Sequence, residues 1–137
     1  MHCRDHVVQL CQHRDEFEHL NVEVLLVSFS SKGYARRWTK EVCPAFRLLL
    51  DREKAVYRAY ELGHSLSRAL NTRTIKSYAQ FVRADRPLRI QGDPAQLGGD
   101  FIIDTEGVIR LAYRSHDPTD RPSAEQLLTV LNKLVER

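Results

Sequence analysis

The chain has 137 residues, 42% of them hydrophobic, which is enough for one domain around a single core. No apolar run approaches the roughly 20 residues of a membrane-spanning helix and no secretion signal is visible, so we expect a cytoplasmic protein. The net charge of +3 is too small to indicate a nucleic-acid partner. Three cysteines are an odd number, so we predict reduced thiols rather than a disulfide framework.

The N-terminal segment is predicted to be a helix from His2 to Leu20. Its apolar residues recur at helical spacing on one face. They are Cys3, Val7, Leu10, Cys11, Phe17 and Leu20. Cys3 falls in the first turn, where unpaired N–H groups and the helix dipole favour a thiolate. Cys3 is therefore the most reactive thiol by position, whereas we expect Cys11 to lie in the core.

A strand and a helix should follow. Val22 to Phe29 is almost continuously apolar, which is typical of a central parallel strand covered on both faces. Ser30 or Ser31 can then cap a helix whose buried stripe is Tyr34, Trp38 and Val42. Cys43-Pro44 ends this helix. We expect Cys43 to pack at this junction, with an approach to Cys3 as the alternative.

The middle of the chain is predicted as a short strand, a helix and an insertion. Phe46 to Leu50 forms the strand, and Asp51 caps a helix that stops at Gly63. Residues 64–90 read as a helical insertion that holds most of the basic excess. Its cations are Arg68, Arg73, Lys76, Arg83, Arg86 and Arg89. They form either a solvated face or a surface for an anionic partner.

The C-terminal part is predicted as a loop, a hairpin and a final helix. Pro87 to Gly99 is a loop, and Gly98 to Arg114 is a β-hairpin whose turn is Asp104 to Gly107. In the following turn, His116, Asp117 and Arg121 either are solvated or line the same sheet end as Cys3. Ser123 with Gln126 is a capping box. It opens a helix with an apolar face of Leu127, Leu131, Leu134 and Val135.

Other chemical groupings are weak. His2, Cys3 and His6 could hold a soft metal such as zinc, but a fourth ligand is not evident. Trp38, Tyr57 and Tyr60 have helical spacing and are expected in the core. Because no phosphate-binding loop, carboxylate pair or nucleophile triad is present, we predict no metal site and no cofactor.

Four segments carry a resemblance to a known family. They are CRDHVVQL from Cys3, VEVLLVSF from Val22, CPAFRLLLDREKAVYRAYELG from Cys43 and QGDPAQLGGDFIIDTEGVIRLAYRSHDPTDRPSAEQLL from Gln91. Together they resemble the peroxiredoxin-like branch of the alkyl hydroperoxide reductase/thiol-specific antioxidant (AhpC/TSA) family. The resemblance implies an α/β fold of thioredoxin-like, peroxiredoxin type, with a mixed sheet flanked by helices over residues 1–137. It also implies an N-terminal truncation, because the opening strand is missing.

The resemblance also implies a thiol chemistry. Members of this branch commonly begin the first helix with Cys-x-x-Cys, and Cys3 matches the second cysteine, so the first falls before residue 1. Many peroxiredoxins place an arginine before the strand that matches Phe101 to Asp104, where this chain has Gly98 and Gly99. We predict a peroxiredoxin-like thiol oxidoreductase with Cys3 and Arg4 as catalytic residues, impaired or inactive alone. Alternatively, Cys3 is an inert remnant and the protein is a non-catalytic thioredoxin-like binding module.

The same hypothesis sets the expected partners. They are a thiol reductant and a peroxide or disulfide substrate, with a homo-oligomer as a further possibility. We expect no nucleic acid and no membrane span.

Overall fold

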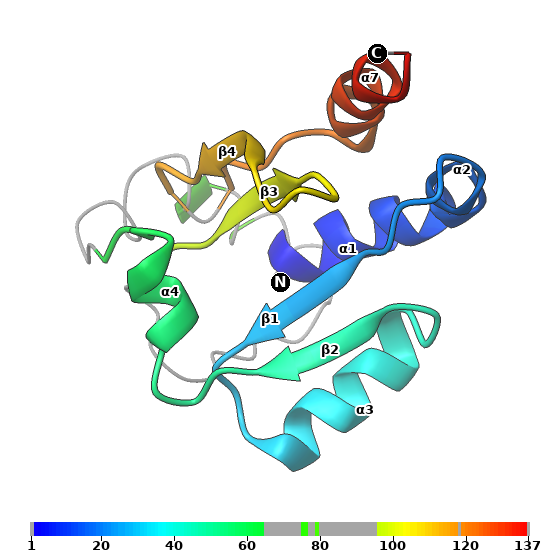
Figure 1. The fold of residues 1–137 in the computed structure, drawn as a ribbon. Helices are drawn as coiled ribbons and strands as arrows, with labels where there is room; N and C mark the ends of the chain where they lie inside the picture. The colour runs from blue at the N-terminus through cyan, green and yellow to red at the C-terminus, as the bar shows by residue number, and fades with distance from the viewer. Residues whose placement is uncertain (1, 65–74, 77–78, 80–95, 118, 137) are drawn as a thin grey trace. The chain divides into compact units, whose positions relative to one another are not determined.

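The computed structural model describes residues 2–64, 75–76, 79, 96–117 and 119–136 (Figure 1). The chain divides into two compact units, each of which is described by itself. One comprises Cys3–Val56 with Pro122–Arg137, and the other comprises Met1–His2 with Tyr57–Arg121. The order of the described elements is helix, helix, strand, helix, strand, helix, then a strand pair and a C-terminal helix.

The first unit opens with two short helices rather than one. Helix α1 spans His2–Gln12 and α2 spans Arg14–His19. The chain leaves helical geometry at His13, whose N–H bonds to the carbonyl of Leu10 only three residues back. Val7, Leu10 and Phe17 are buried as predicted. The apolar face is therefore confirmed, whereas the single continuous helix is wrong.

Strand β1, Leu25–Ser28, pairs in parallel with β2, Arg47–Leu50. Leu25 lies opposite Arg47 in this register and is 47% exposed. Within the described residues β2 is the one strand neighbour of β1. The predicted strand is confirmed, but the prediction that it is covered on both faces is wrong at Leu25, whose side chain none of the described helices covers from the layer above or below.

Helix α3, Lys32–Val42, begins and ends where the sequence predicts. The Ser31 side chain accepts the N–H of Tyr34 at 3.4 Å, and Cys43 leaves the helix with extended backbone angles. Val42 is buried, while Tyr34 and Trp38 are only partly buried. The predicted stripe is therefore less buried than expected, whereas Ala35 of the same helix is buried.

Helix α4, Ala55–Ala59, is held at its start by Asp51. The Asp51 carboxylate accepts the N–H groups of Ala55 at 2.9 Å and Val56 at 2.8 Å, which confirms the predicted cap. The helix ends before the predicted Gly63, since Glu61 has a positive φ of 56°. Tyr57 and Tyr60, expected in the core, are partly buried.

Helix α7, Ala124–Val135, closes the chain and belongs to the first unit. Ser123 and Gln126 form both hydrogen bonds of the capping box, at 3.1 Å and 2.8 Å. Leu127 and Leu131 are buried as predicted, but Val135 is 58% exposed, and Leu128 is buried in its place. The Gln9 side chain of α1 accepts the N–H of Ala124 at 3.1 Å, so α1 contacts the start of α7.

The second unit contains the predicted hairpin. Strand β3, Gly99–Ile103, pairs antiparallel with β4, Ile109–Arg114. The turn closes with Gly107 at φ 83° and its N–H on the carbonyl of Asp104 at 3.0 Å. The ring of Tyr60 packs edge-on against Phe101 with centroids 4.6 Å apart. The hairpin is confirmed, with a register irregularity between Ile102 and Ile103.

The described strands thus form one parallel and one antiparallel pair. This mixed α/β architecture confirms the predicted fold class. The expected insertion at 64–90 lies almost wholly outside the described residues, as does most of the Pro87 to Gly99 loop. In the second unit, Leu97 is 1% exposed and forms part of the core.

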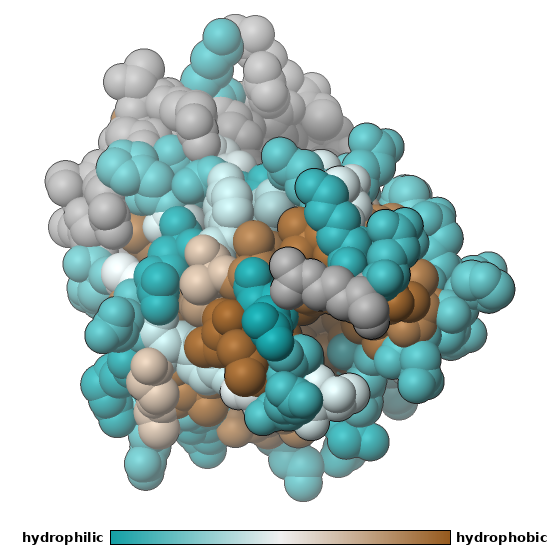
Figure 2. Space-filling model, turned by 45° about the horizontal axis from the view of Figure 1, so that its top comes forward, coloured by the Kyte–Doolittle hydropathy of each residue, from teal (hydrophilic) through white to brown (hydrophobic). Residues whose placement is uncertain are grey.

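Apolar side chains also reach the surface, as the brown areas in Figure 2 show. The large ones that are exposed include Leu25, Leu49, Leu50 and Val56 in one unit and Ile103, Val108 and Ile109 in the other. None of the described helices is long and apolar enough to cross a membrane.

Candidate thiol redox site

The three cysteines occupy helix termini of opposite polarity. Helix α1 places Cys3 in its first turn and Cys11 in its last turn, and Cys43 is the C-terminal cap of α3. The N-terminus of a helix carries partial positive charge and the C-terminus partial negative charge. The backbone therefore places Cys3 at the positive end of a helix, and Cys11 and Cys43 at negative ends.

Cys11 and Cys43 are joined in a disulfide, with their Cα atoms 6.0 Å apart. This overturns the prediction of reduced thiols. Cys43 is 1% exposed, so its predicted packing at the junction is confirmed, while Cys11 is only partly buried and not a full core residue. Helical periodicity correctly put Cys11 on the inward face of α1, but it could not show that the end of α3 lies against that face.

Cys3 and Cys11 cannot pair with each other inside α1. They are eight positions apart, and eight helical steps span about 12 Å along the axis. A disulfide needs Cα atoms within about 7 Å. Because Cys43 is bonded to Cys11, Cys3 is the remaining cysteine of the chain.

Arg4 follows Cys3 in the first turn of α1. Its guanidinium Nη1 lies 3.5 Å from the Glu41 carboxylate near the end of α3, and both side chains are exposed. The predicted catalytic pair is thus adjacent in sequence, and Arg4 shares its charge with a carboxylate. The ion pair and the disulfide both join α1 to the C-terminal part of α3.

The loop after β4 is less solvated than the sequence suggests. Asp117 is 2% exposed and accepts the N–H of Thr119 at 2.8 Å. Asp120 accepts the N–H of His116 at 2.7 Å and the hydroxyl of Tyr113. The prediction of a solvated loop is wrong for Asp117, because its carboxylate closes a turn inside the second unit, whereas His116 is exposed as predicted.

The predicted solvated position is also wrong for Arg121, whose partner the sequence did not indicate. Its Nη1 donates to the Asp100 carboxylate at 2.8 Å, and both side chains are largely buried. A side chain at Gly98 would collide with the Arg121 guanidinium. An arginine therefore lies at the start of β3, although Gly98 and Gly99 occupy the sequence positions where the family resemblance leads us to expect one. The glycine pair was the sequence signal for this arrangement, since glycines leave room for a large side chain from another part of the chain.

The described residues contain no cluster of three or more His, Cys, Asp or Glu side chains that could hold a metal ion. His6 of the predicted histidine pair is buried on α1.

Comparison with protein families gives a match over most of the chain. The model of the AhpC/TSA antioxidant enzyme family matches residues 9–117, which is more than half of the chain. The chain belongs to this family. The AhpC/TSA match includes Cys11, Cys43 and the whole hairpin, and it begins after Cys3 and Arg4. A search of curated proteins found no match.

Membership of the AhpC/TSA family supports the thioredoxin-like α/β fold and a redox role in the peroxiredoxin-like class. The family match does not reach the predicted catalytic residues, so their role depends on the position of Cys3 in α1.

Proposed function

We propose that the protein is a peroxiredoxin-like thiol oxidoreductase in which Cys3 is the reactive thiol. The observation that carries this proposal is the position of the three cysteines relative to the helix termini. Cys3 lies at a helix N-terminus, whereas Cys11 and Cys43 lie at C-termini and are bonded to each other. Of the three cysteines, only Cys3 is outside the disulfide and at a helix start, where the backbone favours a thiolate.

The reaction oxidises the Cys3 sulfur by two electrons. The Cys3 thiolate attacks one oxygen of a hydroperoxide, the S–O bond forms as the O–O bond breaks, and the leaving alkoxide takes a proton to become an alcohol. A first thiol of an external reductant then attacks the sulfenic sulfur and releases water. A second thiol of the reductant breaks this mixed disulfide and returns Cys3 to its thiol.

Neither Cys11 nor Cys43 is placed to act as the resolving thiol. Cys11 is about 12 Å from Cys3 along α1 and is committed to Cys43. The partners are therefore a dithiol reductant and a peroxide or disulfide substrate. Arg4 supplies positive charge beside Cys3, and the Glu41 contact at 3.5 Å holds it on the surface.

The compartment remains a prediction. A cytoplasmic location fits a thiol enzyme, whereas a stable disulfide is more typical of oxidising compartments. The redox state of Cys11 and Cys43 in protein taken directly from cells, trapped by acid and alkylation, distinguishes the two.

The test measures the rate of iodoacetamide alkylation of Cys3 against pH, with Cys11 and Cys43 left as their disulfide. We expect a midpoint well below the ~8.5 of a free thiol. With dithiothreitol as the reductant, peroxide consumption should be lost in Cys3→Ser and retained in Cys11→Ala/Cys43→Ala. An ordinary midpoint in a folded protein, or unchanged turnover in Cys3→Ser, would refute the proposal.

A further inference from the structure

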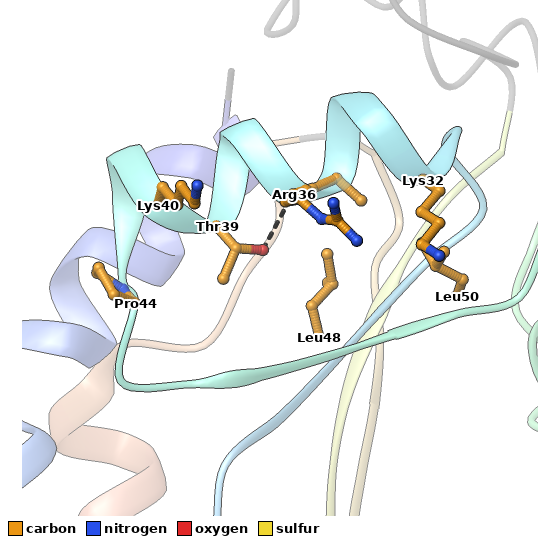
Figure 3. A pocket seen from close by; sticks show the side chains of 8 residues that line it. Lys32, Arg36, Thr39, Lys40, Pro44, Leu48 and Leu50 are labelled. Carbon is orange, nitrogen blue, oxygen red and sulfur yellow. Dashed lines mark hydrogen bonds between the residues drawn. The ribbon is translucent and has the colours of Figure 1, made fainter.

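A groove between α3 and β2 combines a cationic rim with an apolar floor (Figure 3). Its volume is about 360 Å³, within the range of ligand-binding clefts. Helix α3 contributes Lys32, Arg36 and Lys40, while β2 contributes Leu48 and Leu50. All of these residues belong to the first unit.

The three cations form a row along one face of α3. They follow each other at four-residue intervals, which places consecutive Cα atoms about 6 Å apart along the helix axis. All three are exposed, and none has an ion pair with a described carboxylate. The neighbouring acids Glu41 and Glu23 are paired instead with Arg4 and Arg47, each at 3.5 Å.

Helix stability accounts for Lys40, which lies in the last turn of α3 where the dipole favours a cation, but not for the start of the row. Lys32 is the first residue of α3, whose first turn contains no acidic side chain. A cation at a helix N-terminus opposes the dipole, so an acidic residue would stabilise the helix better at that position. A cation at the start of this unpaired row is therefore better explained by an anionic ligand than by the folding of α3.

The apolar floor of the groove is formed by leucines of β2. Leu48 and Leu50 alternate along β2 and so point to the same face, and Leu50 is 41% exposed. In the part of the chain that is described, β2 pairs with β1 and with no other strand. An edge strand beside an apolar strip is a surface on which an extended peptide can align.

The charge pattern decides between classes of ligand. A fatty acid or another monocarboxylate would neutralise one cation and leave two unpaired. An extended peptide with acidic residues at alternate positions carries a carboxylate every 6.6 Å or so, close to the spacing of the cations. A nucleic-acid strand also carries repeated charges, but the groove offers no aromatic side chain on which bases could stack.

We infer that this groove binds an acidic, extended segment of a partner protein, with alternate carboxylates on Lys32, Arg36 and Lys40 and alternate apolar side chains on Leu48 and Leu50. The interaction requires no cysteine. It therefore goes beyond the proposed oxidoreductase function and stands or falls separately from it. It also differs from binding through the basic insertion at 64–90, because every residue of the groove lies outside that segment.

The test uses the full chain and a fluorescein-labelled peptide, Gly-Asp-Val-Asp-Val-Asp-Val-Gly, with fluorescence anisotropy as the readout. The rim variant is K32Q/R36Q/K40Q. The matched control is R37Q/R52Q/K133Q, which removes the same charge from exposed residues of the same unit that do not line the groove. Circular dichroism verifies that both variants fold, and Leu50→Thr tests the apolar floor.

We expect binding that weakens with salt, a loss of about tenfold or more in the rim variant and a change within about twofold in the control. Leu50→Thr should weaken binding, as should a peptide with its three aspartates contiguous. Equal losses in the two triple variants would overturn the inference, as would no binding at about 1 mM peptide. Tighter binding of a ten-nucleotide thymidine oligomer, lost in the rim variant, would overturn it in favour of a nucleic-acid site.

Discussion

Two glycines show how the space around a single Cα decides whether a side chain can be added there. A Cβ at Gly99 would come within 2.7 Å of the Tyr113 carbonyl and 2.8 Å of Leu62, whereas Gly33 in α3 has nothing within 4 Å. The Tyr113 carbonyl belongs to the β-ladder partner and cannot move without disturbing the hairpin. Gly99 is therefore required by close backbone approach and Gly33 is not.

Gly99→Ala should lower the free energy of unfolding by about 1–3 kcal/mol, the usual cost of overpacking. Gly33→Ala should raise it by about 0.5 kcal/mol, because alanine favours the helix and finds open space. Urea denaturation of the two variants measures both changes in the free energy of unfolding. A neutral Gly99→Ala would contradict the close approach.

Asp104 makes the hairpin sensitive to acid. The N–H of Val108 and then the guanidinium of Arg110, with its Nε 2.6 Å from the carboxylate, lower the pKa of Asp104 below its ordinary value of 3.8. A group whose pKa is lower in the folded state stabilises that state above the unfolded pKa. This contribution is lost as pH falls through the folded pKa.

We therefore expect hairpin stability to decline below about pH 4, and Asp104→Asn to remove this part of the decline. The asparagine oxygen can still accept the N–H of Val108 but has no charge to lose. Hydrogen exchange of the β3 and β4 amides along a pH series measures the difference between the two proteins. Parallel pH profiles would show that Asp104 does not contribute.

At the scale of elements, the disulfide is the main structural feature that local sequence patterns did not predict. Cys11 and Cys43 are separated by 32 residues, and their bond ties the end of α1 to the end of α3. Closing a loop of this length restricts the unfolded chain. Cys11→Ala/Cys43→Ala should lower the free energy of unfolding by about 3.5 kcal/mol. Guanidinium denaturation checks this, with Cys3→Ser as the control that keeps the bond.

The elements themselves were largely predictable because their signals are local. Ser31, Asp51 and the Ser123 capping box each act within a few residues, and the structure places a helix after each one. Asp104 to Gly107 specifies its turn in the same way. These features depend on backbone conformation and short-range hydrogen bonds, which a sequence displays directly.

The misjudged features depend on contacts between distant segments. The Cys11–Cys43 bond, the burial of Asp117 and the exposure of Leu25 each depend on which elements lie side by side. The role of Arg121 at the start of β3 also joins residues 21 positions apart. Periodicity shows which face of an element is apolar, but it does not identify the segment that covers this face.

At the scale of the whole molecule, the division into two units limits how far a local change should spread. Cys11, Cys43 and the chain between them all belong to the first unit, whereas the hairpin belongs to the second. Trp38, the one tryptophan of the sequence, lies in α3 and reports on the first unit. Amides of β3 and β4 report on the second.

Reduction of the disulfide in Cys3→Ser should therefore lower the unfolding midpoint seen by Trp38 fluorescence more than it changes hydrogen exchange of the hairpin amides. Gly99→Ala should produce the reverse pattern, since its close contacts are with Leu62, Phe101 and Tyr113 of the second unit. Contacts confined to one unit transmit little energy to the other, which predicts two separable responses. If both probes moved together in both experiments, the chain would unfold as one cooperative body. The disulfide would then stabilise the hairpin as strongly as it stabilises the helices that it joins.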